Sequence, residues 1–144
     1  MADETTIKWL YPPNFSGTYK AGAKGHLRHR IQCTNYSDGT GEDESIKVKR
    51  TDLKTITGEV PSKIVIEQIE YELSGMGVEI SYNNINNEIV AILDDTSGCL
   101  DFTGEGGFVP ADDDDDEGGD IIFTTFGQSL GDTYNIILTV RPKQ

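Results

Sequence analysis

Apolar and polar residues alternate along a segment that begins near residue 26, and the alternation predicts a β-strand. One face of this segment is mainly apolar and the other is polar and basic: Leu27, His29, Ile31 and Cys33 against His26, Arg28, Arg30 and Gln32. A period of two over eight positions is typical of a half-buried strand. Residues 46–50 alternate isoleucine or valine with lysine, which predicts a second strand whose lysines face solvent.

Residues 63–73 fit both a helical and an extended pattern. The helical face would comprise Ile66, Ile69 and Leu73, and the strand face would comprise Val65, Ile69, Tyr71 and Leu73, with Glu67 as the exception. The many β-branched residues, and the entry from Pro61, favour the strand.

Five further segments show strand patterns between turns rich in glycine, asparagine and aspartate: residues 76–82, 88–93, 99–102, 120–126 and 133–141. The segment at 88–93 is expected to be a short, well-buried strand. About eight short strands without a predicted helix indicate a sandwich, and a jelly roll is the eight-strand form. We therefore expect an all-β fold, a single-domain antiparallel β-sandwich that is jelly-roll-like and spans residues 26–144.

Residues 1–25 lie outside these patterns and predict an extended N-terminal arm. Pro12 and Pro13 end its one apolar block and prevent helix continuation. Two roles remain open for Trp9, the only tryptophan. It either caps the end of the core or, together with Leu10 and Tyr11, anchors the arm on a neighbouring subunit, because Trp and Tyr are favoured interface anchors.

The net charge of −13 is spread unevenly along the chain. Residues 1–60 hold nine Lys or Arg and eight Asp or Glu, whereas residues 61–144 hold three and seventeen. Such a surface repels phosphate backbones and anionic lipid, so we expect neither nucleic acid nor membrane as a partner. No run approaches the ~20 apolar residues of a membrane span, and the polar start does not resemble a secretory signal. We expect synthesis in a cytoplasm.

The acidic run Asp112–Glu117 lies in a long polar loop expected at residues 103–119. Three interpretations are open. The run is a solvated loop tip extended by like-charge repulsion, a calcium site that lacks the EF-hand spacing, or a patch that meets a basic partner.

The residues suited to chemistry are not arranged for it. His26 and His29 are three apart in one strand, so their side chains point to opposite faces and cannot share a metal ion. Cys33 and Cys99 belong to no CxxC pair, so we expect reduced, buried cysteines in preference to a disulfide or a zinc site. We predict no catalytic residue, no metal ligand and no cofactor.

Basic residues form a candidate docking surface. Arg28 and Arg30 share one strand face, Lys47 and Lys49 share another, and Arg50 follows directly. If the two strands are neighbours, these residues make one basic stripe. That stripe is either a solvated sheet face or a site for an acidic partner.

Three stretches carry a resemblance to a known class of proteins: Ile7-Lys8-Trp9-Leu10-Tyr11-Pro12-Pro13-Asn14-Phe15, Ile69-Glu70-Tyr71-Glu72-Leu73-Ser74-Gly75-Met76, and Gly131-Asp132-Thr133-Tyr134-Asn135-Ile136 with Arg141-Pro142-Lys143. With these stretches the chain resembles the capsid decoration (cement) proteins of tailed bacteriophages and other small β-rich virion structural proteins. The resemblance implies a β-sandwich or jelly-roll body, a homo-oligomer, and a place on the outer capsid surface in contact with the major capsid protein or other virion subunits. It carries over no catalytic residue.

Two functional hypotheses follow. The first is a non-enzymatic virion structural protein, assembled in the host cytoplasm, that stabilises the capsid shell through protein–protein contacts. Its candidate partner-binding residues are Trp9, Leu10, Tyr11, Arg28, Arg30, Lys47, Lys49 and Arg50. The alternative is a carbohydrate-binding β-sandwich module, with calcium held by the acidic loop.

Overall fold

The fold is an antiparallel β-sandwich of two sheets. A computed structural model describes residues 4–11, 28–53, 61–83, 87–110 and 119–143, which form nine strands and two short 3₁₀ helices. The five strands of the first sheet, here called sheet A, are in spatial order β1 (Glu4–Tyr11), β2 (His29–Tyr36), β9 (Thr133–Lys143), β4 (Lys63–Ser74) and β7 (Ser97–Asp101). The four strands of sheet B are in order β3 (Ser45–Val48), β8 (Ile121–Phe126), β5 (Gly77–Tyr82) and β6 (Ile89–Leu93). The 3₁₀ helices are Arg50–Asp52 and Thr103–Glu105.

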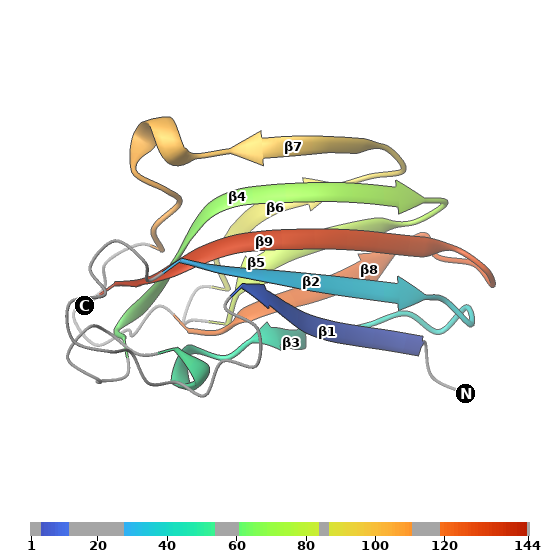
Figure 1. Cartoon of the computed structure of the whole chain (residues 1–144). Helices are drawn as coiled ribbons and strands as arrows, with labels where there is room; N and C mark the ends of the chain where they lie inside the picture. Colours follow the sequence, from blue (N-terminus) through green and yellow to red (C-terminus); the bar gives the residue numbers. More distant parts are fainter. Residues whose placement is uncertain (1–3, 12–27, 54–60, 84–86, 111–118, 144) are drawn as a thin grey trace.

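The strand order is that of a jelly roll. Strands β2 and β9, β3 and β8, β4 and β7, and β5 and β6 pair antiparallel, so the eight strands form four nested pairs divided between two layers (Figure 1). Sequential strands switch sheets from β2 to β3 and from β4 to β5. The predicted jelly-roll-like sandwich is therefore confirmed.

The ninth strand comes from the expected arm. Residues 4–11 are extended and pair with β2 as the edge strand β1 of sheet A. The Trp9 ring meets His29 edge-on, with ring centroids 5.4 Å apart, and packs against the core of its own chain. Residues 12–25 of the arm lie outside the described residues.

The core lies between the sheets and follows the predicted alternation. In β2 the buried positions are His29, Ile31 and Cys33, as expected, and Asn35. The neighbouring strand β9 contributes Tyr134, Ile136, Leu138 and Val140, each at most 1 % exposed. Sheet B covers them with side chains that include Tyr82, Ile80 and Phe123. Burial of these aliphatic and aromatic side chains is the main term holding the two layers together.

Strand β4 confirms the extended interpretation of residues 63–73, but a β-bulge changes its faces. Pairing with β9 steps from Ile66 opposite Val140 to Gln68 opposite Thr139, so Glu67 is an extra residue. The inserted residue shifts the alternation by one. Ile66 therefore belongs to the core, whereas Val65, predicted to face inward, packs against Gly107 outside the core cluster.

Candidate binding surfaces

The predicted basic stripe does not form, because the two strands that would make it lie in different sheets. Arg28 precedes β2 and Arg30 lies on it, in sheet A, whereas Lys47 lies on β3 in sheet B. The Arg28 Nε donates to a carboxylate oxygen of Glu67 at 2.6 Å, and the Arg30 guanidinium donates to Glu70 at 3.0 Å. Both arginines therefore pair within the polar outer face of sheet A.

Strand β3 departs from the predicted faces at Ile46 and Lys47. Lys47 was expected in solvent but is 5 % exposed, whereas Ile46, expected in the core, is 40 % exposed. A register shift between Ile46 and Val48 lets Val48 remain buried. Lys49 is exposed, and the guanidinium of Arg50 donates to the Pro61 carbonyl at 2.8 Å.

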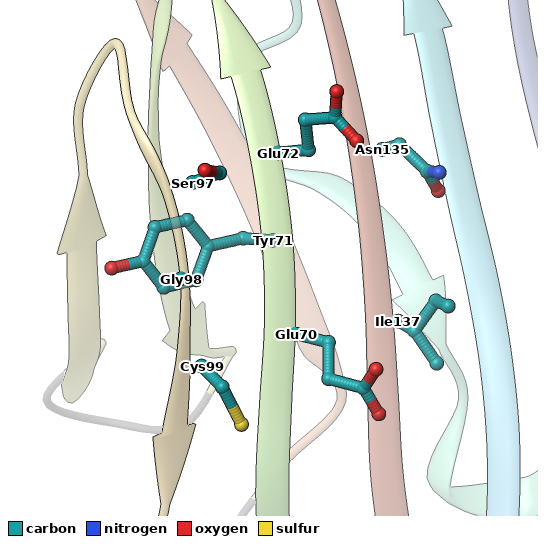
Figure 2. A pocket seen from close by; sticks show the side chains of 8 residues that line it. All are labelled: Glu70, Tyr71, Glu72, Ser97, Gly98, Cys99, Asn135 and Ile137. Atoms are coloured by element: carbon teal, nitrogen blue, oxygen red, sulfur yellow. The ribbon is translucent and has the colours of Figure 1, made fainter.

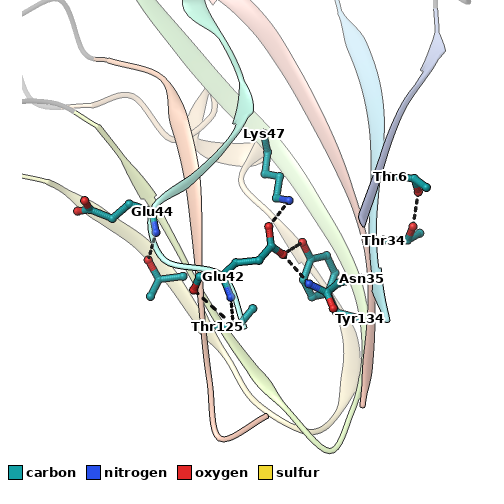
Figure 3. Close-up of polar contacts among 9 residues, drawn as sticks. Thr6, Thr34, Asn35, Glu42, Glu44, Lys47, Thr125 and Tyr134 are labelled. Carbon is teal, nitrogen blue, oxygen red and sulfur yellow. Dashed lines mark hydrogen bonds and ion pairs between the residues drawn. The ribbon is translucent and has the colours of Figure 1, made fainter. Parts of the chain in front are cut away.

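The cause of the Lys47 inversion is a buried acid, Glu42, which the sequence analysis did not single out. Its carboxylate accepts hydrogen bonds from the Lys47 ammonium, from the Tyr134 hydroxyl at 2.5 Å and from the Asn35 amide at 2.7 Å (Figure 3). Its backbone N–H donates to the Thr125 hydroxyl at 2.7 Å. These contacts join the loop after β2 to strands of both sheets.

Burial and hydrogen bonding act in opposite directions on Glu42. Burial disfavours its charged form, but the bonds from Lys47, Tyr134 and Asn35 outweigh burial and lower the pKa of the carboxyl below its ordinary value. Burial, and then the Glu42 charge, raise the pKa of Tyr134. Because the Glu42 and Lys47 side chains are only 7 % and 2 % exposed, the charged groups of this cluster are inaccessible from solvent, and the cluster has a structural role.

The described histidine and the two cysteines show no catalytic arrangement. Burial lowers the pKa of His29 to about 4, so the ring is neutral at neutral pH. His26 lies outside the described residues. Burial raises the pKa of Cys33 to about 12, whereas Cys99 is exposed on β7, contrary to the expectation that both are buried. Both thiols are free, as predicted.

Within the described ranges, no group of three or more His, Cys, Asp or Glu could hold a metal ion. The acidic run Asp112–Glu117 lies outside them. No helix in the described part of the chain has the length and apolar character needed to cross a bilayer.

The outer face of sheet A is polar and hollowed. Two open hollows of about 490 and 540 Å³ adjoin along β4, between β7 and β9, and share Glu72, Ser97 and Asn135. We call this surface the polar trough; its lining also includes Glu70, Cys99 and Ile137. Figure 2 shows the two carboxylates pointing toward β9, and Tyr71 pointing the other way, toward Gly98.

The outer face of sheet B carries exposed apolar side chains beside polar ones such as Glu79 and Ser81, and this distinguishes it from the polar face of sheet A. Ile46 pairs with the buried Ile122, and Ile92 pairs with Glu79, all on the outer side of the sheet. We call the exposed part of this surface the apolar face: Ile46 (40 % exposed), Ile89 (49 %), Ile92 (62 %) and Phe126 (40 %).

Phe126 is held on the apolar face by a glycine. A Cβ atom added at Gly77 would lie 2.2 Å from Cζ of Phe126, so the ring lies flush over the bare backbone of β5. An aromatic ring above a strand glycine is a known device for covering exposed backbone. The ring is therefore an ordered part of this surface.

Sequence patterns did not identify the apolar face. The segment at residues 88–93 was predicted to be well buried, yet Ile89 and Ile92 are the most exposed side chains of the face. The prediction was wrong because β6 is the edge strand of sheet B. An unbroken aliphatic run is equally compatible with a buried central strand and with an exposed apolar edge strand.

Comparison of the chain with protein-family models, with curated proteins and with solved structures finds no significant match.

Proposed function

We propose that this chain is a non-enzymatic structural protein that docks through the apolar face onto a larger protein assembly. The phage resemblance suggests that this assembly is a capsid shell and that the chain acts there as a decoration protein. The observation that carries the proposal is the number of exposed apolar side chains on one side of the sandwich, Ile46, Ile89, Ile92 and Phe126, whereas the other side is polar. Exposed large apolar side chains gathered on one side of a protein are typical of interaction sites.

Charge supports the same role. The net charge of −13 keeps free copies apart in solution, while apolar contact area on one face favours attachment at a matching site. A decoration protein attaches at many lattice positions, so a modest contact per copy is multiplied over the shell.

The docking residues of this proposal differ from those expected from the sequence. Trp9 packs on the core of its own chain, and Arg28 and Arg30 pair with neighbouring carboxylates. We therefore assign docking to sheet B in place of the arm and the basic stripe.

Co-sedimentation tests the proposal with shells of the major capsid protein encoded in the same genome. We expect saturable binding of the wild-type chain and about tenfold or weaker binding of Ile92→Asp, because a charge must then be desolvated at the contact. Leu130→Asp is the matched control: Leu130 is 76 % exposed in the β8–β9 turn, beside Gly39, and is not one of the residues of the apolar face. Absence of wild-type binding, or equal loss in both variants, would refute the docking role.

A second candidate function rests on the polar trough. Carboxylates, an amide and a hydroxyl line one open hollow, with Glu70 and Glu72 beside Asn135 and Ser97, and such groups hydrogen-bond the hydroxyls of a sugar. We propose glycan binding as the alternative.

An NMR titration with oligosaccharides, with and without calcium, separates the two functions. Glycan binding predicts shifts at Glu72 and Asn135 that disappear in Glu72→Gln/Asn135→Ala and persist in Ile92→Asp. Docking through sheet B predicts that the trough variant still joins the shell. Shifts spread evenly over the protein would contradict the glycan alternative.

A further inference from the structure

Strand β6 differs in composition from the other sheet edges that the structure describes. The remaining edge strands carry charge: β1 contains Glu4 and Lys8, β3 contains Lys47, and β7 ends at Asp101. Strand β6 is Ile89-Val90-Ala91-Ile92-Leu93, entirely aliphatic. Natural sheets commonly protect exposed edges with charges or proline, and an edge without them is suited to pairing with another strand.

The core is incompletely covered beside this edge. Val90 and Ala91 of β6 pack against the core yet are only partly buried, and so are Tyr71 of β4 and Leu100 of β7 across the sandwich. Gly98 of β7 contributes no side chain, and the Tyr71 ring occupies its place. An added strand beside β6 would cover both this inner opening and the outward side chains of Ile89 and Ile92.

Acidic residues lie at both ends of the aliphatic strand and determine which partner strand could pair with it. Glu88 precedes it, Asp94 and Asp95 follow it, and Glu79 lies opposite Ile92 on β5. Two-fold antiparallel pairing of two copies would place Glu88 of one copy beside Asp94 of the other, which is repulsive. An apolar strand with basic flanks would instead meet opposite charge at both ends.

We propose that β6 accepts an added β-strand from a partner protein, a short aliphatic extended segment flanked by lysine or arginine. The proposal rests on the docking function and names the partner's chemistry. Main-chain hydrogen bonds to the β6 edge would supply affinity, and the acidic rim would supply specificity. The added strand would extend sheet B to five strands.

The probe is the synthetic peptide Lys-Lys-Val-Ile-Val-Thr-Val-Lys-Lys, titrated into the ¹⁵N-labelled full chain. We expect amide shifts and slowed hydrogen exchange concentrated at residues 89–93, because strand addition protects edge amides. A peptide with glutamates in place of the four lysines is expected to bind at least ~10-fold more weakly, because its flanks repel the acidic rim.

Two variants separate edge pairing from general stickiness. Ile89→Thr/Ile92→Thr keeps strand propensity but removes the outward apolar contacts, and we expect at least ~10-fold weaker peptide binding. Ile7→Thr is the matched control on edge strand β1, where Ile7 is 45 % exposed, and should bind normally.

Several other outcomes would overturn the proposal. Shifts centred on β1 or β7 would place the acceptor elsewhere. Equal affinity for the acidic and the basic peptide would contradict the role of charge. Protection of the β6 amides that increases with protein concentration in the absence of peptide would show that a second copy of the chain pairs with β6. Shell binding without peptide protection of β6 would sustain the docking function and overturn strand addition. Peptide protection of β6 without shell binding would sustain strand addition and overturn the docking function.

Discussion

At the scale of single residues, the buried Glu42–Lys47 pair is the most consequential feature that alternation could not predict. A lysine in an alternating strand is expected to face solvent, but the carboxylate that draws Lys47 inward lies in a loop five residues earlier. Asn35 and Tyr134, which complete the cluster, come from strands β2 and β9, and Tyr134 is 92 residues from Glu42 in the sequence. Such a partner set exists only once the chain is folded.

We predict that Lys47→Met destabilises the protein by about 3–5 kcal/mol, because it leaves the Glu42 carboxylate buried without a cation. Lys49→Met, two residues away on the exposed side, should change stability by less than about 0.5 kcal/mol. Urea unfolding measures both. The buried-pair argument fails if the two variants prove equally stable.

Acid should destabilise the protein in two separable pH windows. The pKa of His29 falls from 6.5 to about 4 on folding, so the unfolded chain binds the extra proton and stability decreases as pH falls from 6.5 toward 4. The folded pKa of Glu42 lies below 4.5, so its contribution is present above 4.5 and is lost as pH falls through the folded value.

Urea unfolding between pH 7 and 3 tests this prediction. His29→Leu should flatten the decline between pH 6.5 and 4, a change of up to about 3 kcal/mol, and leave the lower window unchanged. A wild-type profile that is already flat above pH 4.5 would contradict the neutral, buried state of His29.

At the scale of elements, strand identity could be predicted but edge position could not. The β-branched composition of residues 63–73 correctly favoured a strand, and alternation correctly gave the core face of β2. Within β4, the bulge at Glu67 appears in the sequence as the one residue that breaks the pattern. Whether an aliphatic run such as β6 lies centrally or at an edge depends on partners elsewhere in the chain.

The β4–β5 turn requires a glycine at position 75. Gly75 has φ of +83°, and a Cβ atom there would lie 2.3 Å from Oδ1 of Asp132, which accepts the Ser129 N–H through its other oxygen. We predict that Gly75→Ala costs about 1–3 kcal/mol through backbone strain and this clash. Gly104→Ala, with open space around the position, is the control and should be near neutral. Thermal unfolding of both variants distinguishes a local glycine requirement from a general sensitivity of loops.

At the scale of the whole molecule, excess negative charge opposes the compact state. The Arg30–Glu70 pair offsets it little, because its side chains are 44 % and 40 % exposed and exposed pairs contribute at most about 1 kcal/mol. In the Arg28–Glu67 pair only the arginine is exposed. The Glu42–Lys47 pair is buried and therefore weakly screened by salt. Added salt should act mainly on the unbalanced repulsion.

We predict that Tm rises as NaCl increases from 20 to about 200 mM, a range over which the Debye length shortens from roughly 20 to 7 Å. A gain of about 1 kcal/mol corresponds to roughly 4 °C for a domain of this size. Asp94→Asn/Asp95→Asn reduces the net charge from −13 to −11. If repulsion is the cause, this variant starts with a higher Tm and gains less from salt. A Tm that falls with salt would instead show that attractive pairs outweigh the excess charge, and the electrostatic account of why free copies stay apart would fail with it.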